Sequence, residues 1–243
     1  MKFTKQQNKY TVDKLNPIHF VKRCLINKEV KQLITPGKKV KIADLGCGFG
    51  IISRELTKFA KIDAYDIDAP TIKFAQKVFP QSPQLNFYND SLFNIKNKNY
   101  DFVVCSEVLQ YVVDDLEAFK KINKILQPKG QLILTVPFNK NLITAFDKRE
   151  RSRRYSLKGL TAKMEKANFK IKKIRYWGYP LLKCFYFNIY LPKSNQEAVK
   201  EEKNYQLSAI SLWLLKYIKY LFLIDLLFNS KKSFGLLLIG QKK

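Results

Sequence analysis

The sequence predicts an α/β fold in which parallel strands alternate with helices. Short apolar runs alternate with helical patterns from Val40 to about Tyr176. The first run, Val40 to Leu45, leads directly into a glycine-rich turn and a helix, which is a common beginning of an open parallel sheet. The run Tyr100 to Cys105 is almost wholly apolar, as expected of a strand that is buried on both faces.

The glycine-rich turn is the centre of the prediction. In the stretch KVKIADLGCGFGIIS, three glycines follow the first strand at the spacing G-x-G-x-G. Glycine tolerates a positive φ and lets a ligand approach the backbone closely, and a helix beginning near Phe49 or Gly50 offers free N–H groups. The spacing is tighter than the dinucleotide fingerprint, and Asp44 before the turn suits an ammonium-bearing ligand better than a pyrophosphate. The alternative is a tight turn without a ligand.

Acidic residues follow the next two strands. Asp66 ends the second strand about 20 residues after Asp44, where a carboxylate can accept hydrogen bonds from both hydroxyls of a ribose. We expect Asp68 to be the N-cap of the helix that follows. Asp90 stands after the third strand in the sequence Asn-Asp-Ser, which is also an ordinary turn or helix cap.

Several motifs together resemble the class I S-adenosylmethionine-dependent methyltransferases. DLGCGFG resembles the first motif of this family and YDIDAPTIKFA its second-strand motif. SEVLQYVVDD is similar to the fourth-strand region of members that modify quinones and related lipids. LQPKGQLILTVPF resembles the L-x-P-G-G-x-L motif, with Lys129 in place of one glycine. The resemblance implies a doubly wound, seven-stranded, mostly parallel sheet of the Rossmann-like type, with an antiparallel last strand.

The same resemblance implies S-adenosylmethionine as the cofactor and assigns residues to it. Asp66 would bind the ribose, Asp90 would accept a hydrogen bond from the adenine amino group, and Ser106 would lie where the fourth strand opens toward the methyl group. The cofactor-binding set that we expect is Asp44, Gly46, Cys47, Gly48, Gly50, Asp66, Ile67, Asp90, Ser91 and Ser106. We expect no metal site, because the four cysteines are scattered and form no C-x-x-C pair.

The residue that assists the reaction stays open at this point. The candidates are Glu107, Tyr111, Tyr155 and His19. Tyr111 stands where relatives with an E-V-L-x-H pattern have a histidine, which removes one candidate base. His19 is the single histidine, and a surface histidine is the favoured interpretation over a catalytic base. Because the methyl donor is already activated, positioning and exclusion of water are the protein's main tasks.

Three segments are expected. Residues 1–38 form a polar N-terminal arm and a cap helix that begins at Pro17. Residues 39–176 together with 233–243 form the cofactor-binding core. Residues 177–232 form an apolar helical insertion before the last strand, which includes an amphipathic helix from Ser208 to Phe228. We expect this insertion to be a substrate lid or a membrane-facing element; packing on the core or a dimer interface is the alternative.

Charge and composition restrict the function. The net charge is +25, which favours anionic partners or reflects compositional bias. The N-terminus shows no signal peptide, so we expect a cytoplasmic protein, either free or peripheral on the inner face of a membrane. We expect methyl transfer to a small, hydrophobic or lipid-linked acceptor. An RNA methyltransferase is the alternative, although SEVL is not the N-P-P-[YF] motif of base-amine methylation; a non-catalytic cofactor-binding module is the second. The oligomeric state stays open.

Overall fold

The fold is a seven-stranded mixed sheet, seen here in a computed structural model that describes residues 4–80, 82–96, 99–142, 147–148, 152–190 and 216–243. The strand order is β3-β2-β1-β4-β5-β7-β6, and only β7 runs antiparallel to its neighbours. This confirms the expected sheet. The strands are β1 (Lys41–Leu45), β2 (Lys61–Asp66), β3 (Leu85–Asn89), β4 (Tyr100–Ser106), β5 (Leu126–Pro137), β6 (Phe169–Trp177) and β7 (Gly235–Lys242).

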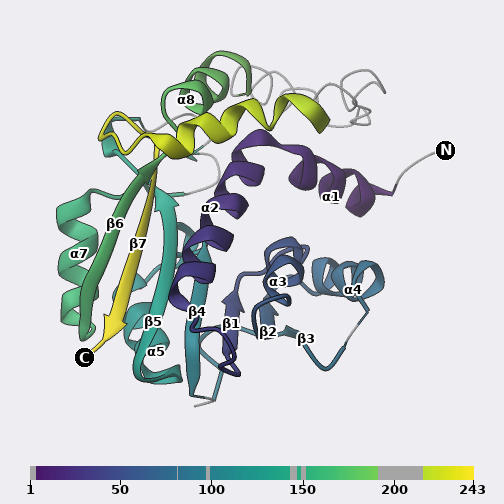
Figure 1. Ribbon diagram of the computed structural model, residues 1–243, viewed down its shortest axis with the longest axis vertical. Coiled ribbons are helices and arrows are strands. Elements are labelled where there is room, and N and C mark those ends of the chain that lie inside the picture. The colour runs from purple at the N-terminus through teal and green to yellow at the C-terminus, as the bar shows by residue number, and fades with distance from the viewer. Residues whose placement is uncertain (1–3, 81, 97–98, 143–146, 149–151, 191–215) are drawn as a thin grey trace.

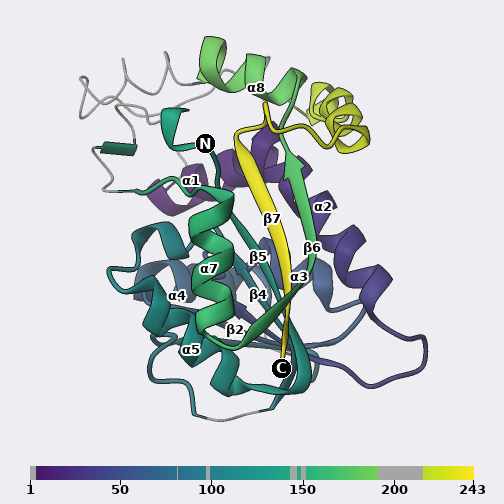
Figure 2. The ribbon, with the colours of Figure 1, turned by 90° about the vertical axis from the view of Figure 1, so that its left-hand side faces the viewer.

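Helices cover both faces of the sheet (Figure 1 and Figure 2). Neighbouring residues of a strand point to opposite faces, so Ile42 and Ala43 of β1 enter different hydrophobic clusters. The inner strands β1 and β4 are therefore buried on both sides, which explains their apolar runs in the sequence. One face is covered by α2 (Pro17–Leu33), α3 (Ile51–Leu56) and α4 (Ala69–Val78), and the other by α5 (Asp115–Ile125) and α7 (Leu157–Lys166).

The chain changes direction in the sheet at β1. From β1 it winds outward to β2 and β3, then returns to the other side of β1 to form β4. The carboxyl ends of β1 and β4 are consequently neighbours, and the connections leaving them diverge to opposite faces. A crevice outside such a switch point is the usual ligand site of an open α/β sheet. Both the glycine turn after β1 and the segment Glu107 to Tyr111 after β4 lie there; the latter contains the short helix η1 (Leu109–Tyr111).

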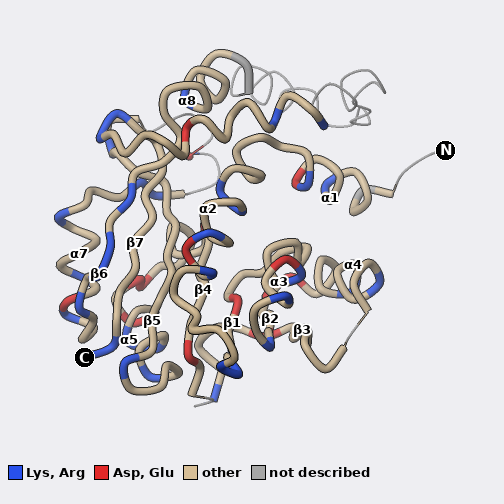
Figure 3. The backbone as a smooth tube through the Cα atoms, viewed as in Figure 1, with Lys and Arg blue, Asp and Glu red and all other residues tan. Residues whose placement is uncertain are grey.

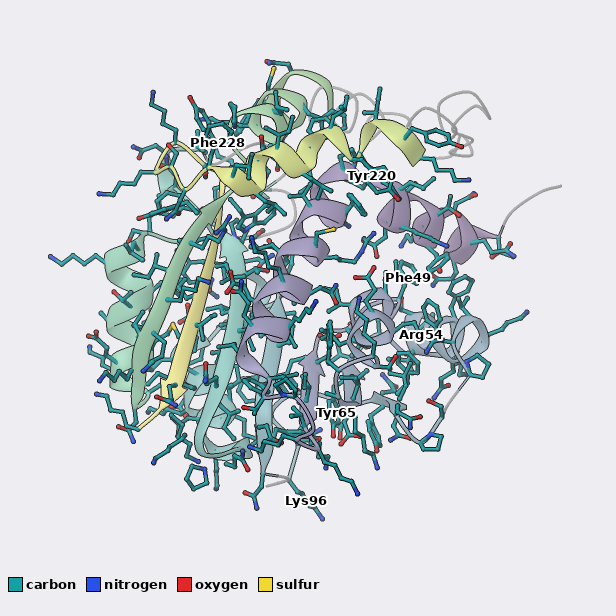
Figure 4. All side chains as sticks on the ribbon, viewed as in Figure 1. Phe49, Arg54, Tyr65, Lys96, Tyr220 and Phe228 are labelled. Atoms are coloured by element: carbon teal, nitrogen blue, oxygen red, sulfur yellow. The ribbon has the colours of Figure 1, made fainter. Side chains whose placement is uncertain are left out.

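The N-terminal segment differs from the polar arm that the sequence suggested. Residues Lys5–Leu15 form a helix, α1, which begins with a capping box between Thr4 and Gln7. The ring of Tyr10 lies 5.9 Å from that of Phe49 and 5.6 Å from that of Phe74. The helix is therefore packed on the glycine turn and on α4 through aromatic contacts, and Figure 4 shows Phe49 below α1.

A buried arginine joins α1, α2 and α3. Arg23 of α2 is only 4% exposed, and its guanidinium donates hydrogen bonds to the carbonyls of Asp13 and Lys14 at the end of α1. The same guanidinium contacts the carboxylate of Glu55 on α3 at 3.3 Å. These contacts satisfy carbonyls that the end of a helix leaves free, and they fix the N-terminal helices over the carboxyl edge of the sheet.

The insertion between β6 and β7 is described only in part. Its described elements are α8 (Leu181–Phe185), the π-helical turn η3 (Tyr186–Tyr190) and the 3₁₀ helix η4 (Leu221–Leu227); a further short helix, η2 (Lys140–Leu142), follows β5. Of the expected helix Ser208 to Phe228, the part before residue 216 lies outside the described residues. In the described parts of the chain, no helix is long and apolar enough to span a membrane.

The η4 segment, residues 216–228, is anchored by two buried polar residues, Lys219 and Asp225. The Asp225 carboxylate accepts hydrogen bonds from the backbone N–H groups of Leu181 and Leu182 at 2.9 and 2.8 Å. The Lys219 ammonium lies 4.6 Å from the centre of the Phe20 ring. These contacts fix the segment on α8 and α2. Its apolar side chains are divided between the core, where Phe222, Leu223 and Leu226 pack, and the outer surface, where Leu221, Ile224 and Leu227 are exposed.

Candidate functional site

The glycine turn has one open position. All three of its glycines have a positive φ: 67° at Gly46, 52° at Gly48 and 73° at Gly50. A Cβ on Gly46 would lie 2.2 Å from Val108, and one on Gly50 would lie 2.4 Å from the ring of Phe87, so these two glycines are required by packing. A Cβ on Gly48 would meet no atom within 4 Å. The backbone at Gly48 is therefore the point that a ligand can approach closely.

Two acids stand beside this open position. Asp66, at the end of β2, accepts hydrogen bonds from the N–H groups of Gly48 and Asp68 at 2.8 and 2.9 Å. Asp90, just after β3, donates its own N–H to the Asp66 carbonyl at 3.0 Å. Its carboxylate accepts hydrogen bonds from the Ser91 N–H at 2.8 Å and the Asn94 amide at 2.9 Å. The two acids are thus fixed beside each other at the same sheet edge.

Two exposed apolar side chains follow these acids in the sequence. Ile67, which follows Asp66, is 77% exposed. Phe93, which follows Ser91 by two residues, is 45% exposed. Exposed apolar side chains beside hydrogen-bonding carboxylates suit a flat ring with polar edges, such as a purine. The residues present therefore fit the adenosine half of S-adenosylmethionine.

Asp44 lies beneath the turn rather than in the open position. It is 1% exposed, and its carboxylate accepts a hydrogen bond from the Ser53 hydroxyl at 2.6 Å. Burial raises the pKa of Asp44 to about 6, and the charge of Asp66 acts in the same direction, whereas the Ser53 hydrogen bond opposes the rise. Asp44 thus holds the first turn of α3 against β1. The neighbouring Cys47 thiol has a pKa well above its ordinary value because of burial, so it is a poor nucleophile.

The segment after β4 forms the second wall of the crevice. Ser106 forms a 3.0 Å hydrogen bond with the hydroxyl of Thr135. Glu107 has a φ of 58°, a conformation that is uncommon for a residue with a side chain. One oxygen of the Glu107 carboxylate accepts a 3.2 Å hydrogen bond from the Gln110 amide, while its Oε1 atom is buried without a hydrogen bond. The carbonyl oxygen of the Gln110 side chain is also buried without a hydrogen bond.

Lys22 opposes Glu107 from α2, and the sequence analysis missed it. Lys22 is 8% exposed. Burial lowers the pKa of Lys22 and so does Arg23, while the charges of Glu107 and Asp13 oppose this shift. One signal was available: Lys22 lies four residues after Ile18 and three before Leu25, on the apolar side of its helix. A lysine at such a position either extends to the surface or has a buried partner.

The other candidate catalytic residues lie in different surroundings. Tyr155 is 5% exposed, and its hydroxyl hydrogen-bonds to the Leu109 carbonyl at 2.9 Å and the Asp115 carboxylate at 3.1 Å. It holds η1 against α5, so we leave it out of the proposed acceptor site. Tyr111 is 52% exposed at the end of η1. His19 is paired through Nδ1 with Asp13, the acid at the end of α1.

In the described parts of the chain, no group of three or more His, Cys, Asp or Glu side chains could hold a metal ion. The site consists instead of an open glycine, the acids Asp66 and Asp90 on one side, and Glu107 with Lys22 on the other. The first group fits a nucleoside. The second adds a buried negative and a buried positive charge above the turn.

Comparisons with known proteins show what the chain is similar to. Residues 43–134 match the family described as "Methyltransferase domain". Malonyl-[acyl-carrier protein] O-methyltransferase 1 of Ilyobacter polytropus is 30% identical over 117 residues, which are 46% of this chain and 42% of that protein. The ubiquinone biosynthesis O-methyltransferase of Coxiella burnetii is 29% identical over 133 residues, 53% of this chain and 55% of that protein. The chain therefore spans about half the length of these curated relatives.

Solved structures share the fold over most of the chain. Phosphoethanolamine N-methyltransferase 2 of Haemonchus contortus, in complex with S-adenosyl-L-methionine, matches with a TM-score of 0.63 and 14% identity, covering 90% of this chain and 52% of that one. The [4+2]-cyclase SpnF matches with a TM-score of 0.65 and 14% identity, covering 90% and 80%. The match over residues 43–134 and the shared fold show a methyltransferase domain of the Rossmann-like type in this chain, and they support S-adenosylmethionine as its cofactor.

Proposed function

We propose that this protein transfers a methyl group from S-adenosylmethionine to a small, hydrophobic or lipid-linked acceptor. The observation that carries this proposal is the convergence of Gly48, Asp66 and Glu107 at one sheet edge, in a protein whose insertion has an outward apolar surface. The curated relatives, named for O-methylation of malonyl-acyl-carrier protein and for ubiquinone biosynthesis, are compatible with such an acceptor.

The chain's own residues have three tasks in this reaction. Asp66 and Asp90 hold the nucleoside and so fix the position of the methyl group. The helices α1 and α2, joined by Arg23, cover the crevice and limit the access of water. Tyr111, which is 52% exposed at the end of η1, is the candidate to accept a proton from the acceptor. The cofactor, when bound, supplies a methyl group already activated on a sulfonium, so orientation accounts for most of the required acceleration.

The hydrophobic character of the acceptor is suggested by the outer surface of the η4 segment. We call this surface the apolar stripe; its exposed side chains are Tyr217, Tyr220, Leu221, Ile224, Leu227 and Phe228. Leu227 is 82% exposed and Leu221 is 60% exposed, and Figure 4 shows Tyr220 and Phe228 toward the two ends of the segment. A contiguous patch of this kind on a soluble surface usually marks a contact with another molecule.

We propose that the apolar stripe rests on an anionic membrane surface. Lysines stand at both ends of the stripe: Lys216 at one and Lys231 with Lys232 at the other (Figure 3). Close to an anionic leaflet, each lysine contributes about 1 kcal/mol to binding. Aromatic side chains such as Tyr217 and Tyr220 are suited to the interface between headgroups and acyl chains. A lipid-linked acceptor would then reach the crevice from the membrane side.

The two alternatives make different demands. An RNA methyltransferase would need a phosphate-tracking surface beside the crevice, but Arg23, a cation at that edge, instead contacts the carbonyls of Asp13 and Lys14 and the carboxylate of Glu55. A protein that binds the cofactor without methyl transfer stays an alternative, because the fold is shared by the [4+2]-cyclase SpnF. The relatives named as O-methyltransferases favour transfer.

A direct assay distinguishes these possibilities. The purified protein is incubated with S-adenosylmethionine labelled on its methyl group and with either a total lipid extract or total RNA, and label is counted in each. We expect label in the lipid extract, and its loss in the Asp66→Asn variant. Label in RNA alone would overturn the acceptor class. Binding of the cofactor with no label in either fraction, or in a pool of small metabolites, would favour the non-catalytic alternative.

A further inference from the structure

We infer that Lys22 and Glu107 form a clamp for the amino-acid end of the cofactor, with Lys22 receiving the carboxylate and Glu107 the ammonium. This inference rests on the proposed function, because it assumes the same ligand over the glycine turn. It adds a role for the helix α2, which lies outside the matched family segment of residues 43–134.

The first observation is the position of the two charges. Glu107 follows Ser106 at the carboxyl end of β4, and the adjacent Val108 packs so closely on the glycine turn that a Cβ on Gly46 would lie 2.2 Å from it. Lys22, on α2, lies close enough to Glu107 for their opposite charges to attract each other. Glu107 is therefore held beside the glycine turn through Val108, and Lys22 is a positive charge near it.

The second observation is that these charges do not pair with each other. The charge of Glu107 acts to raise the pKa of Lys22, but no nitrogen–oxygen distance between the two side chains is within 4.0 Å. The Glu107 Oε1 atom is buried without a hydrogen bond. Among the described residues, the Lys22 ammonium has no hydrogen bond or ion pair either, although the residue is only 8% exposed. Leaving buried charges uncompensated is costly, so the arrangement indicates a missing partner.

The third observation concerns what surrounds the pair. The other charged groups near Lys22 are Asp13 and Arg23, and both are engaged. Asp13 is paired with His19. Burial raises the pKa of Asp13, but the charge and hydrogen bond of His19, together with the charges of Arg23 and Lys22, lower it below its ordinary value. Arg23 is held by the carbonyls at the end of α1 and by Glu55. Lys22 and Glu107 are therefore the two charges that stay available to a ligand.

A zwitterion satisfies both at once. The methionine part of the cofactor carries one ammonium and one carboxylate on the same carbon atom, so it can lie between a lysine and a glutamate that are near but not in contact. Each contact would be a charge-assisted hydrogen bond in a site largely removed from water, where such bonds are strongest. The side-chain carbonyl oxygen of Gln110, which is buried without a hydrogen bond, would accept a further hydrogen bond from the ammonium.

The test compares four ligands by titration calorimetry on the full chain. S-adenosylmethionine and S-adenosylhomocysteine carry both charges, decarboxylated S-adenosylmethionine keeps only the amino group, and methylthioadenosine lacks the amino-acid end. We expect Lys22→Met to weaken the first two about 10- to 100-fold and to leave the last two unchanged. We expect Glu107→Gln to weaken the first three and to leave methylthioadenosine unchanged. Lys28→Met, which removes an exposed lysine of the same helix, is the matched control.

The outcomes separate this inference from the proposed function. If wild-type protein binds all four ligands and Lys22→Met changes none of the affinities, the clamp is wrong while the cofactor site stands. If Lys22→Met weakens methylthioadenosine as strongly as the others, the effect is structural and the clamp is also wrong. If wild-type protein binds none of the four, the proposed function itself fails. A clamp requires the ligand-selective pattern.

Discussion

The ring of Tyr10 lies 5.9 Å from the ring of Phe49, nearly perpendicular to it at 80°. Tyr10 belongs to the first helix and Phe49 stands between two glycines of the turn, so the N-terminal helix is fixed directly on the proposed cofactor site. Aromatic contacts of this kind contribute about 0.5–1.5 kcal/mol each beyond burial, and Tyr10 makes three, with Phe49, Phe74 and Phe79. The cover of the crevice is therefore stabilised from below.

Replacing this tyrosine tests whether α1 is such a cover. We expect Tyr10→Ala to destabilise the protein by roughly 1–4 kcal/mol and to increase cleavage by protease within α1. The cofactor should protect α1 from cleavage in the wild type and less so in the variant. Limited proteolysis with and without S-adenosylhomocysteine measures both effects. Lys9→Ala, an exposed change on the same helix, is the control; equal cleavage of the two variants would contradict the prediction.

The assignment of Asp66 is tested through its charge. We expect Asp66→Asn to weaken cofactor affinity at least about tenfold, because charge-assisted hydrogen bonds are worth roughly 1.5–3 kcal/mol each. Asparagine has nearly the same size and still accepts from the Gly48 N–H, so the turn should stay in place. Calorimetry with S-adenosylhomocysteine measures the affinity. Asp68→Asn, which keeps the N-cap of α4, is the control, and an equal loss in both variants would argue against a specific role.

Two glycines of the turn should respond differently to the same substitution. In Gly50→Ala the new methyl group would meet the ring of Phe87 at 2.4 Å, so we expect a loss of about 2–4 kcal/mol in the free energy of unfolding. In Gly48→Ala only the positive φ is unfavourable, which costs about 1 kcal/mol, but the methyl group occupies the open position. Urea denaturation and cofactor titration together should therefore show a stability defect in the first variant and mainly a binding defect in the second.

Asp44 should make stability depend on pH. Burial raises its pKa from the ordinary 3.8 to about 6, so the folded protein retains a proton that the unfolded chain releases as the pH rises through this window. Stability contributed by the protonated form is present below pH 4 and is lost by about pH 6, to the extent of about 3 kcal/mol at 1.36 kcal/mol per unit. Asp44→Asn keeps an acceptor for Ser53 and should remove this loss. Parallel urea titrations between pH 4 and pH 7 would show it; identical slopes in both proteins would contradict it.

The η4 segment offers a matched pair for membrane binding. Leu227 is 82% exposed, so Leu227→Glu should change stability by less than about 0.5 kcal/mol while removing binding to vesicles that contain anionic lipid. Asp225 is fully buried and accepts two backbone hydrogen bonds from α8, so Asp225→Ala should destabilise by roughly 2–4 kcal/mol. Vesicle flotation at low salt and thermal unfolding measure the two effects. Unchanged flotation of Leu227→Glu would rule out the apolar stripe as the membrane contact.

The sheet and its glycine turn could be predicted because their causes are local. Buried parallel strands need apolar residues throughout. The N-cap Asp68 follows from side-chain chemistry, and it is observed. The N-terminal helix was not predicted, because the residues of its capping box, Thr4 and Gln7, are polar and are equally common in an irregular segment. In addition, the ring of Phe49, on which Tyr10 of this helix packs, is far away in the sequence.

The positions of the two acids were easier to predict than the position of Lys22. Acids at strand ends are fixed by the sheet, so Asp66 and Asp90 could be placed at its edge from the sequence, while their roles stay predictions. The proximity of Lys22 to Glu107 depends on how α2 crosses the sheet, which no local pattern specifies. Asp225 shows the same limit: its partners, Leu181 and Leu182, are more than 40 residues away, and an amphipathic pattern does not specify what its polar half contacts.

The pairing of β6 with β7 brings the two ends of the insertion together, so that another segment could replace it. Trp177, the last residue of β6, is paired with Gly235, the first residue of β7, and the Trp177 indole occupies the place where a Gly235 Cβ would be, at 2.3 Å. The insertion between these two residues therefore leaves the sheet and returns to it at one place, and the pairing of its ends does not depend on its length. Because closing a longer loop costs only about 0.6 kcal/mol per doubling of its length, this segment could be replaced by recombination as a cassette. Acceptor choice could then diversify between lineages without any change in the glycine turn or its acids.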